Sequence, residues 1–256
     1  MERIMLNFIQ GMLGWLAYGV IMFFGVIIHE LGHLITGILQ GFKFVSITAG
    51  PFGICKNDKN KLEFYFVKNL SLLGSALTVP IHQNEDNAKK FARVILGGPL
   101  ASLLIGGISY SLFMILSPLW YSELMGMFGG FSILLGIMSL APMRFGAFYT
   151  DGARWFRLKQ KKTKPIEVAT LNLAAALLGN DKNVARVNPD DFNFLIHSDD
   201  LVARVNGHYY RCLYYRDGGD DGDYQKAKKE FNELNVLWSI KKVYLDELNQ
   251  SIKEQK

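Results

Sequence analysis

The sequence contains only two cysteines, Cys55 and Cys212, which lie far apart along the chain. Two isolated thiols give no basis for a disulfide framework or for a cysteine-rich zinc site. The first apolar run also lacks the small-residue cleavage site of a signal peptide, and it is too long to be one. We therefore expect this run to be retained as part of the fold.

Charged side chains are almost absent from residues 8–40, where Glu30 is the only one. A bilayer crossing needs ~20 apolar residues, so this stretch is long enough to span a membrane. The whole apolar run, residues 4–39, exceeds one crossing and is expected to tilt, to break or to begin with an interfacial piece. Further apolar segments at residues 91–119 and 124–141 predict a second and a third crossing.

Glycines recur along the first apolar segment. Small residues at such spacing favour close packing between membrane helices, and we prefer this interpretation to a hinge. The glycines concerned are Gly11, Gly14, Gly19, Gly25, Gly32 and Gly37.

Lysine and arginine are unevenly distributed around the three segments. They are frequent in residues 40–93 and 154–164, whereas the turn between the second and third crossings has none. The positive-inside rule then predicts a cytoplasmic C-terminus and an N-terminus on the other side of the membrane. Because the net charge of +5 comes from residues beside apolar segments, lipid is an expected partner and nucleic acid is not. We expect a multi-pass protein of a cell membrane, of the bacterial plasma-membrane type.

The motif His29-Glu30-Leu31-Gly32-His33 lies inside the first apolar segment. In a helix the two histidines are one turn apart, so both imidazoles leave the same face and can bind one ion. Zinc accepts imidazole nitrogens and leaves one position open for water in catalytic sites. The carboxylate of Glu30 is placed to take a proton from that water, which is the pattern of a metalloprotease.

An alternative is that this motif arose by chance on a polar, solvated helix face. Its surroundings argue against that alternative, because the neighbouring residues are apolar and offer no solvent. Ionisable groups within a membrane helix are costly, on the order of a few kcal/mol each, and are functional by default. The sequence therefore predicts a metal site within the membrane.

Asp151 is predicted to be the third protein ligand of one zinc ion per chain. It follows the third apolar segment, and the charge distribution places it at the same membrane depth as His29 and His33. A carboxylate is a common third ligand beside two histidines. The alternative is that Asp151 only forms a turn with Gly152 or caps the following helix.

Between the first two crossings the pattern changes to that of strands. Residues 42–48 and 62–67 are rich in β-branched and aromatic side chains and predict a β-hairpin, at about residues 42–67, on the cytoplasmic face. One interpretation is a small sheet that only covers the core, and another is a sheet edge that accepts an extended substrate strand. Residues 69–80 are apolar but short, and they are expected to form an interfacial or re-entrant piece.

The C-terminal part is soluble in character. Amphipathic helices are predicted at residues 166–178, 201–215, 224–234 and 237–252. The acidic segment at residues 217–223 does not fit a calcium loop and is expected to be a turn. The segment around residues 209–231 resembles a tetratricopeptide (TPR) unit, with a plain helical bundle as the alternative. We expect His82, His197 and His208 to be ordinary surface or loop residues.

Taken together, these residues resemble the site-2 protease family of intramembrane zinc metalloproteases. The resemblance rests on the histidine motif, on Gly98-Pro99 in the second crossing, and on Pro142 followed by Asp151 and Gly152. The family usually has Asn where this chain has Ser102 and Ser139. The resemblance implies a core of three membrane helices, zinc bound by both histidines and the aspartate, and hydrolysis of peptide bonds in membrane-anchored proteins or small membrane peptides.

We therefore expect a mainly α-helical membrane protein, with a protease core at residues 1–157 and a cytosolic helical domain at residues 158–256. A chain that is 50% hydrophobic and 20% charged fits such a division. The alternative function is a non-catalytic membrane scaffold that recruits a cytosolic partner through residues 165–256. The presence of Glu30 argues against it, because a purely structural metal site needs no general base.

Overall fold

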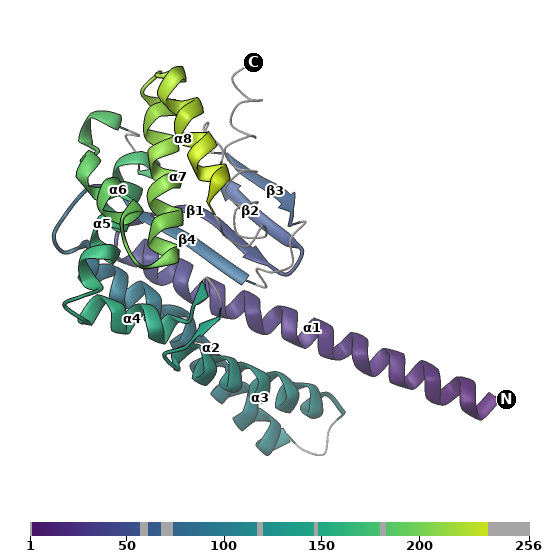
Figure 1. Ribbon diagram of the computed structural model, residues 1–256. Helices are drawn as coiled ribbons and strands as arrows, with labels where there is room; N and C mark the ends of the chain where they lie inside the picture. Colours follow the sequence, from purple (N-terminus) through teal and green to yellow (C-terminus); the bar gives the residue numbers. More distant parts are fainter. Residues whose placement is uncertain are drawn as a thin grey trace.

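A computed structural model describes residues 2–56, 61–67, 74–116, 120–145, 148–179 and 183–234 (Figure 1). Over these residues the protein is mainly helical, as predicted. The helices are α1 (Glu2–Leu39), α2 (Asn87–Leu116), α3 (Trp120–Leu140), α4 (Asp151–Lys159), α5 (Lys164–Leu178), α6 (Pro189–Ile196), α7 (Leu201–Asp217) and α8 (Asp221–Glu233). The strands are β1 (Phe42–Ala49), β2 (Phe52–Lys56), β3 (Leu62–Phe66), β4 (Gly74–Pro80), β5 (Arg144–Phe145) and β6 (Phe148–Tyr149).

Three of the described helices are long and apolar enough to cross a membrane, which confirms the number predicted. They cover Gly14–Leu39, Asn87–Leu116 and Tyr121–Leu140. Helix α1 is continuous from Glu2 to Leu39, so the first apolar run does not break. Helices α2 and α3 lie side by side, whereas the N-terminal half of α1 extends away from both (Figure 1).

The glycines of α1 divide into two groups. Near the histidine motif they allow close helix packing, because a side chain at Gly32 would overlap the backbone carbonyl of Gly97 on α2. At Gly11, Gly14 and Gly19 a Cβ would meet no atom of the described residues within 4 Å. Close packing is therefore confirmed near the histidine motif, and for the N-terminal half of α1, where side chains such as that of Trp15 are exposed, it stays a prediction.

Residues 42–80 form a four-stranded antiparallel sheet in the order β3-β2-β1-β4, rather than a single hairpin. Strand β2 lies between the two strands that the sequence pattern had paired. It forms a tight hairpin with β1 because Gly50, at φ 53°, adopts the left-handed conformation that the turn requires. Over its described part, the piece expected at residues 69–80 to be interfacial or re-entrant is strand β4, which pairs with β1; its position relative to the membrane stays a prediction.

The sheet packs along α1, where it flanks the histidine motif. The ring of Phe23 lies 5.8 Å from that of Phe52, which anchors the β1–β2 turn. Farther along α1, a Cβ at Gly37 would meet the side chain of Thr78 on β4. Strand β4 therefore runs beside the segment of α1 that lies between these two contacts and contains His29 and Glu30.

The predicted helices at residues 166–178, 201–215 and 224–234 are confirmed by α5, α7 and α8, and the one at 237–252 lies outside the described residues. The sequence analysis missed α6. These helices share one apolar core, to which Val79 of β4 also contributes.

The TPR-like arrangement stays a prediction. The turn expected at residues 217–223 covers only residues 218–220, because Asp217 ends α7 and α8 begins at Asp221, with Asp220 as its N-cap. His208 is not a surface residue: it lies on the inner face of α7 and is 8% exposed.

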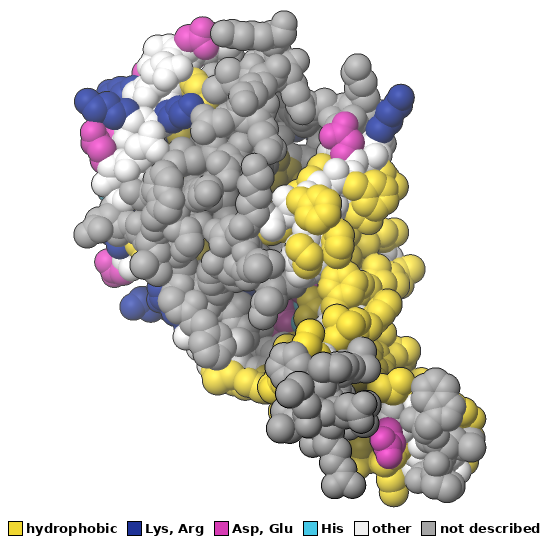
Figure 2. Space-filling view, turned by 90° about the vertical axis from the view of Figure 1, so that its right-hand side faces the viewer, with side chains coloured by type: hydrophobic (Ala, Val, Ile, Leu, Met, Phe, Trp, Pro, Cys, Tyr) yellow, Lys and Arg dark blue, Asp and Glu magenta, His cyan; other side chains and the backbone are white. Residues whose placement is uncertain are grey.

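The visible face of the molecule separates apolar from charged side chains. Figure 2 shows apolar side chains spread over its lower right part, whereas lysine, arginine and acidic side chains gather mainly at the upper left. The large exposed apolar residues include Trp15, Phe64, Leu104 and Ile115. Such a wide apolar surface is unusual for a protein surrounded by water and fits contact with lipid.

Candidate metal centre

His29 and His33 project from one face of α1 towards α2. Their ring centroids are 5.0 Å apart, as expected for residues separated by one helical turn. Helix α2 can approach this face because its residue 98 is glycine: a Cβ there would overlap the imidazole of His33. Close packing of α1 on α2 thus removes both imidazoles from the surface.

Each imidazole is oriented through its Nδ1 atom. His33 Nδ1 lies 2.8 Å from the backbone carbonyl of Val94, which can only accept a hydrogen bond. His29 Nδ1 lies 2.9 Å from the hydroxyl of Ser102, a residue that is fully buried. When Nδ1 donates to such a partner, the Nε2 atom carries the free electron pair that a metal ion requires.

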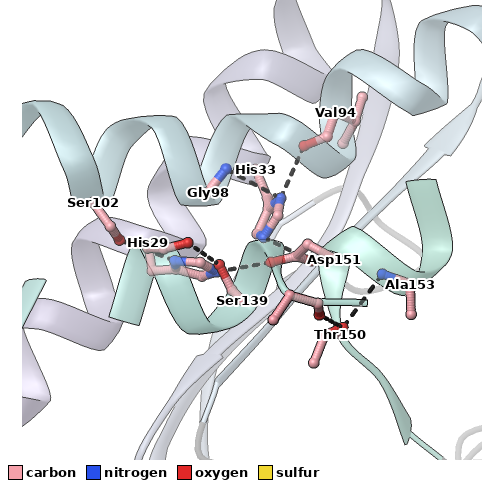
Figure 3. Close-up of polar contacts among 11 residues, drawn as sticks. His29, His33, Val94, Gly98, Ser102, Ser139, Thr150, Asp151 and Ala153 are labelled. Atoms are coloured by element: carbon pink, nitrogen blue, oxygen red, sulfur yellow. Dashed lines mark hydrogen bonds and ion pairs between the residues drawn. The ribbon is translucent and has the colours of Figure 1, made fainter. Parts of the chain in front are cut away.

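The carboxylate of Asp151 lies between the two Nε2 atoms (Figure 3). One oxygen, Oδ2, is 3.1 Å from His29 Nε2, and the other, Oδ1, is 3.4 Å from His33 Nε2. Bonds of ~2 Å in a tetrahedral zinc site place neighbouring donor atoms about 3.3 Å apart. The donor atoms of all three residues lie within 4.8 Å of one another, so the group has the dimensions of a metal site.

Thr150, and not Asp151, is the N-cap of α4. The Thr150 hydroxyl accepts a hydrogen bond from the backbone N–H of Ala153 and donates one to the carbonyl of Ala141, at 2.6 Å. Asp151 is therefore the first residue of the helix, and capping does not engage its carboxylate. The alternative that Asp151 serves only as a cap is thus excluded.

Hydrogen bonding keeps the Asp151 carboxylate ionised. Burial disfavours the charged form, but the hydrogen bonds from His29 and His33 outweigh this effect and hold the pKa of Asp151 well below its usual range. An ion bound here would take the place of the Nε2 protons in these hydrogen bonds, and two imidazoles with one carboxylate then match the donor set of catalytic zinc.

Glu30 lies beside the imidazoles and is also buried. Its carboxylate accepts a hydrogen bond from the backbone N–H of Ala76 on β4. A Cβ at Gly74 would lie 2.5 Å from Oε1 of Glu30, so only glycine leaves room for the carboxylate there. The structure thus places a buried carboxylate next to the candidate metal ligands, with β4 against its other side.

The sequence analysis missed several residues that support this group. Ser102 was noted only as part of the family's segment on the second crossing, although its spacing of four residues from Gly98 places both on one helix face. Thr150 could have been found as a cap residue directly before Asp151. The carbonyl of Val94 has no sequence signal. Ser139 lies beside His29 in Figure 3, but its hydroxyl donates to the carbonyl of Gly136.

Comparison with known protein families gives a match to peptidase family M50 over residues 17–255, which is nearly the whole chain. The match includes the histidine motif, Asp151 and the C-terminal helices. The comparisons with curated proteins and with solved structures gave no match.

Proposed function

The chain belongs to peptidase family M50, the site-2 protease family of intramembrane metalloproteases, and we propose that it hydrolyses peptide bonds of membrane-anchored proteins or small membrane peptides near the cytoplasmic face. The observation that carries this proposal is the position of Asp151. Its carboxylate contacts His29, although 122 residues separate the two in sequence. A shared metal ion would explain why a carboxylate so far along the sequence lies between two imidazoles.

One zinc ion per chain would be held by His29, His33 and Asp151. The outer contacts with Ser102 and Val94 engage only Nδ1 of each histidine, so Nε2 can exchange its proton for zinc, and the carboxylate is ionised. When bound, zinc would polarise the substrate carbonyl and lower the pKa of the attacking water.

Glu30 would act as general base and then as general acid. Its carboxylate would take one proton from the attacking water as the oxygen adds to the substrate carbonyl carbon. It would then deliver that proton to the nitrogen of the leaving amine as the C–N bond breaks. Ala76 would help to hold the carboxylate in place, because its backbone N–H donates a hydrogen bond to it.

A helical substrate must unwind before its carbonyl groups are accessible, because they are engaged in helical hydrogen bonds. We propose that the sheet holds the unwound segment. Among the described strands, β3 and β4 form the two edges, and β4 is the edge beside Glu30. An extended peptide that pairs with β4 would lie next to the general base. The sheet edge expected at residues 42–67 to accept a substrate strand is therefore better assigned to β4.

The loop charges support a cytoplasmic position for the end of the core that holds Asp151. The basic residues that follow α3, among them Arg154 and Lys159, belong to α4 and the segment beyond it, at the end of the core that holds Asp151. If this end faces the cytoplasm, cleavage occurs near the cytoplasmic leaflet and α5–α8 lie in the cytosol.

The test compares the membrane peptides of cells that produce the wild-type protein or the Glu30→Gln variant, using mass spectrometry. We expect peptides cut within or beside their apolar segments only with the wild type, while both proteins bind about one zinc ion. Chelation should stop cleavage by the purified wild type, and zinc should restore it.

Glu123→Gln is the matched control, because Glu123 lies in the first turn of α3, at the opposite end of that helix from Asp151. This variant should cleave like the wild type. Equal cleavage by Glu30→Gln and the wild type would contradict the proposed mechanism. Zinc binding without any cleavage would instead favour the scaffold function.

A further inference from the structure

A second cluster of buried charge lies outside the candidate metal centre, at the other end of α4. It consists of Arg157 of α4, Glu167 of α5 and Asp200, the N-cap of α7. Their side chains are only 12%, 8% and 9% exposed. Groups with full charge are rarely buried to this extent unless they are paired, so the cluster is a specific connection between these elements.

Arg157 connects both acidic residues. Its Nε lies 2.6 Å from Oε1 of Glu167, and one Nη lies 2.7 Å from Oδ2 of Asp200. The planar guanidinium can hold two carboxylates at once because it presents several N–H groups in a fixed geometry. Burial disfavours the charged guanidinium, but the hydrogen bond to Glu167 and the nearby carboxylates outweigh this effect and raise the pKa of Arg157.

Tyr149 completes the connection on the other side of Asp151. Its hydroxyl donates to the same oxygen of Asp200 that accepts from Arg157, at 3.0 Å. The guanidinium of Arg157 lies over the tyrosine ring, 4.4 Å from its centroid. Tyr149 lies two residues before Asp151, and Arg157 lies six residues after it. The contacts with Asp200 therefore hold the chain on both sides of Asp151.

Residues 149–157 are therefore attached to two different parts of the molecule. Thr150 binds to the end of α3 through the carbonyl of Ala141. Tyr149 and Arg157 bind to the helices α5 and α7. The position of the Asp151 carboxylate relative to the imidazoles of α1 then depends on both attachments, and not on the membrane helices alone.

We propose that Arg157 is a positioning residue for Asp151, and that Asp200 and Glu167 hold the metal-ligand carboxylate in place through it. This inference rests on the proposed function, in which Asp151 binds zinc. It makes α5 and α7 part of the metal centre, although neither contacts the imidazoles. Residues around a metal site that orient its ligands commonly change metal affinity by about 10- to 100-fold when they are replaced.

The competing explanation is that the buried charges only stabilise the fold. A purely structural pair elsewhere in the same helices would then have the same effect when it is broken. Arg211 of α7 and Glu230 of α8 form such a pair between these two helices. It serves as the matched control.

The experiment measures the zinc dissociation constant of the full-length protein by competition with a chromophoric chelator, together with thermal unfolding of the zinc-free protein. Asp200→Asn is the main variant. Its amide oxygen can still accept from Val202 N–H and cap α7, whereas its NH₂ group cannot accept from Tyr149 and Arg157. Glu230→Gln is the control, and Arg157→Ala and Arg157→Lys complete the series.

We expect Asp200→Asn and Arg157→Ala to raise the zinc dissociation constant by about 10- to 100-fold. Arg157→Lys should have a smaller effect, because one ammonium group retains the charge but not the fork geometry. Glu230→Gln should leave the constant within about twofold of wild type, whatever its effect on the unfolding temperature.

Two results would overturn the inference. One is an unchanged dissociation constant in Asp200→Asn and Arg157→Ala, even if both variants unfold at lower temperature. The other is an equal loss of affinity in Glu230→Gln, which would indicate general loosening of the helices. A wild-type protein that does not bind zinc would instead contradict the proposed function itself, so the two failures are distinguishable.

Discussion

The carbonyl oxygen of Leu140, at the end of α3, occupies the space that a side chain at Gly152 would need. No flexible group separates the two, because the obstacle is backbone at the C-terminus of a membrane helix. Gly152 directly follows Asp151, so this contact sets how closely the first turn of α4 approaches α3. The position of the Asp151 carboxylate relative to α3 therefore depends on residue 152 having no Cβ.

Gly152→Ala should displace the first turn of α4 and separate Asp151 from the imidazoles. Overpacking of this kind typically costs about 1–3 kcal/mol of stability. We expect a lower unfolding temperature and a loss of at least about tenfold in zinc affinity. Gly107→Ala on α2 is the control, since a Cβ there meets no atom within 4 Å, and it should bind zinc normally. Normal zinc affinity in Gly152→Ala would show that this contact does not position the ligand.

Ser102→Ala removes the partner of His29 Nδ1. The imidazole then loses the hydrogen bond that fixes its orientation, and zinc affinity should fall by about 10- to 100-fold. Ser132→Ala is a matched control, because Ser132 of α3 is equally buried but its hydroxyl has no hydrogen-bond partner among the described residues. A competition titration with both variants would separate the two serines, and equal affinities would argue against an orienting role for Ser102.

Gly74 and Gly98 should have separable effects, because they face different groups. Gly74→Ala would push on the end of the Glu30 side chain, so the catalytic rate should fall by up to about 100-fold while zinc still binds. Gly98→Ala would push on the imidazole of His33 and should weaken zinc binding itself. Parallel measurement of turnover and bound zinc tests this contrast. Loss of zinc from Gly74→Ala would place that glycine in the metal centre instead.

His208 should make the protein less stable in mild acid. Burial, followed by the nearby charge of Arg211, lowers the pKa of His208 from 6.5 to about 4. Between these values the unfolded chain binds a proton that the folded chain does not, so the free energy of unfolding falls as the pH drops from about 6.5 to about 4. His208→Gln should reduce this dependence by up to about 1.4 kcal/mol per pH unit. Thermal unfolding in detergent at pH 7 and pH 5 measures it, and an identical shift in both proteins would contradict the assignment.

Features that depend on short stretches of chain were predictable. The three membrane helices follow from the length of the apolar segments, because a bilayer fixes the length that each crossing needs. The common face of His29 and His33 follows from the helical repeat. Helices α5, α7 and α8 follow from amphipathic patterns of the same period, since each pattern spans several turns.

The sheet could not be predicted in the same way. Strand β2 has five residues and includes a glycine, and β4 belongs to an apolar run that equally fits a membrane interface. Short strands form because a partner strand satisfies their backbone hydrogen bonds, and that partner is not visible in their own sequence. The hairpin was therefore assigned to the two stretches with the clearest pattern, although β2 separates them.

From the sequence alone it follows that an ionisable motif lies within an apolar helix, and this predicts a metal ion as the partner of His29 and His33. The folded chain shows how Asp151 reaches them, that Thr150 and not Asp151 caps α4, and that Arg157 connects α4 to Asp200. The physical reason is that helical periodicity and hydrophobicity act over a few residues. Contacts between distant parts of the chain, such as His29 and Asp151 at a separation of 122 residues, depend on how closely the helices pack, and that is set by glycines whose neighbours are known only in the folded chain.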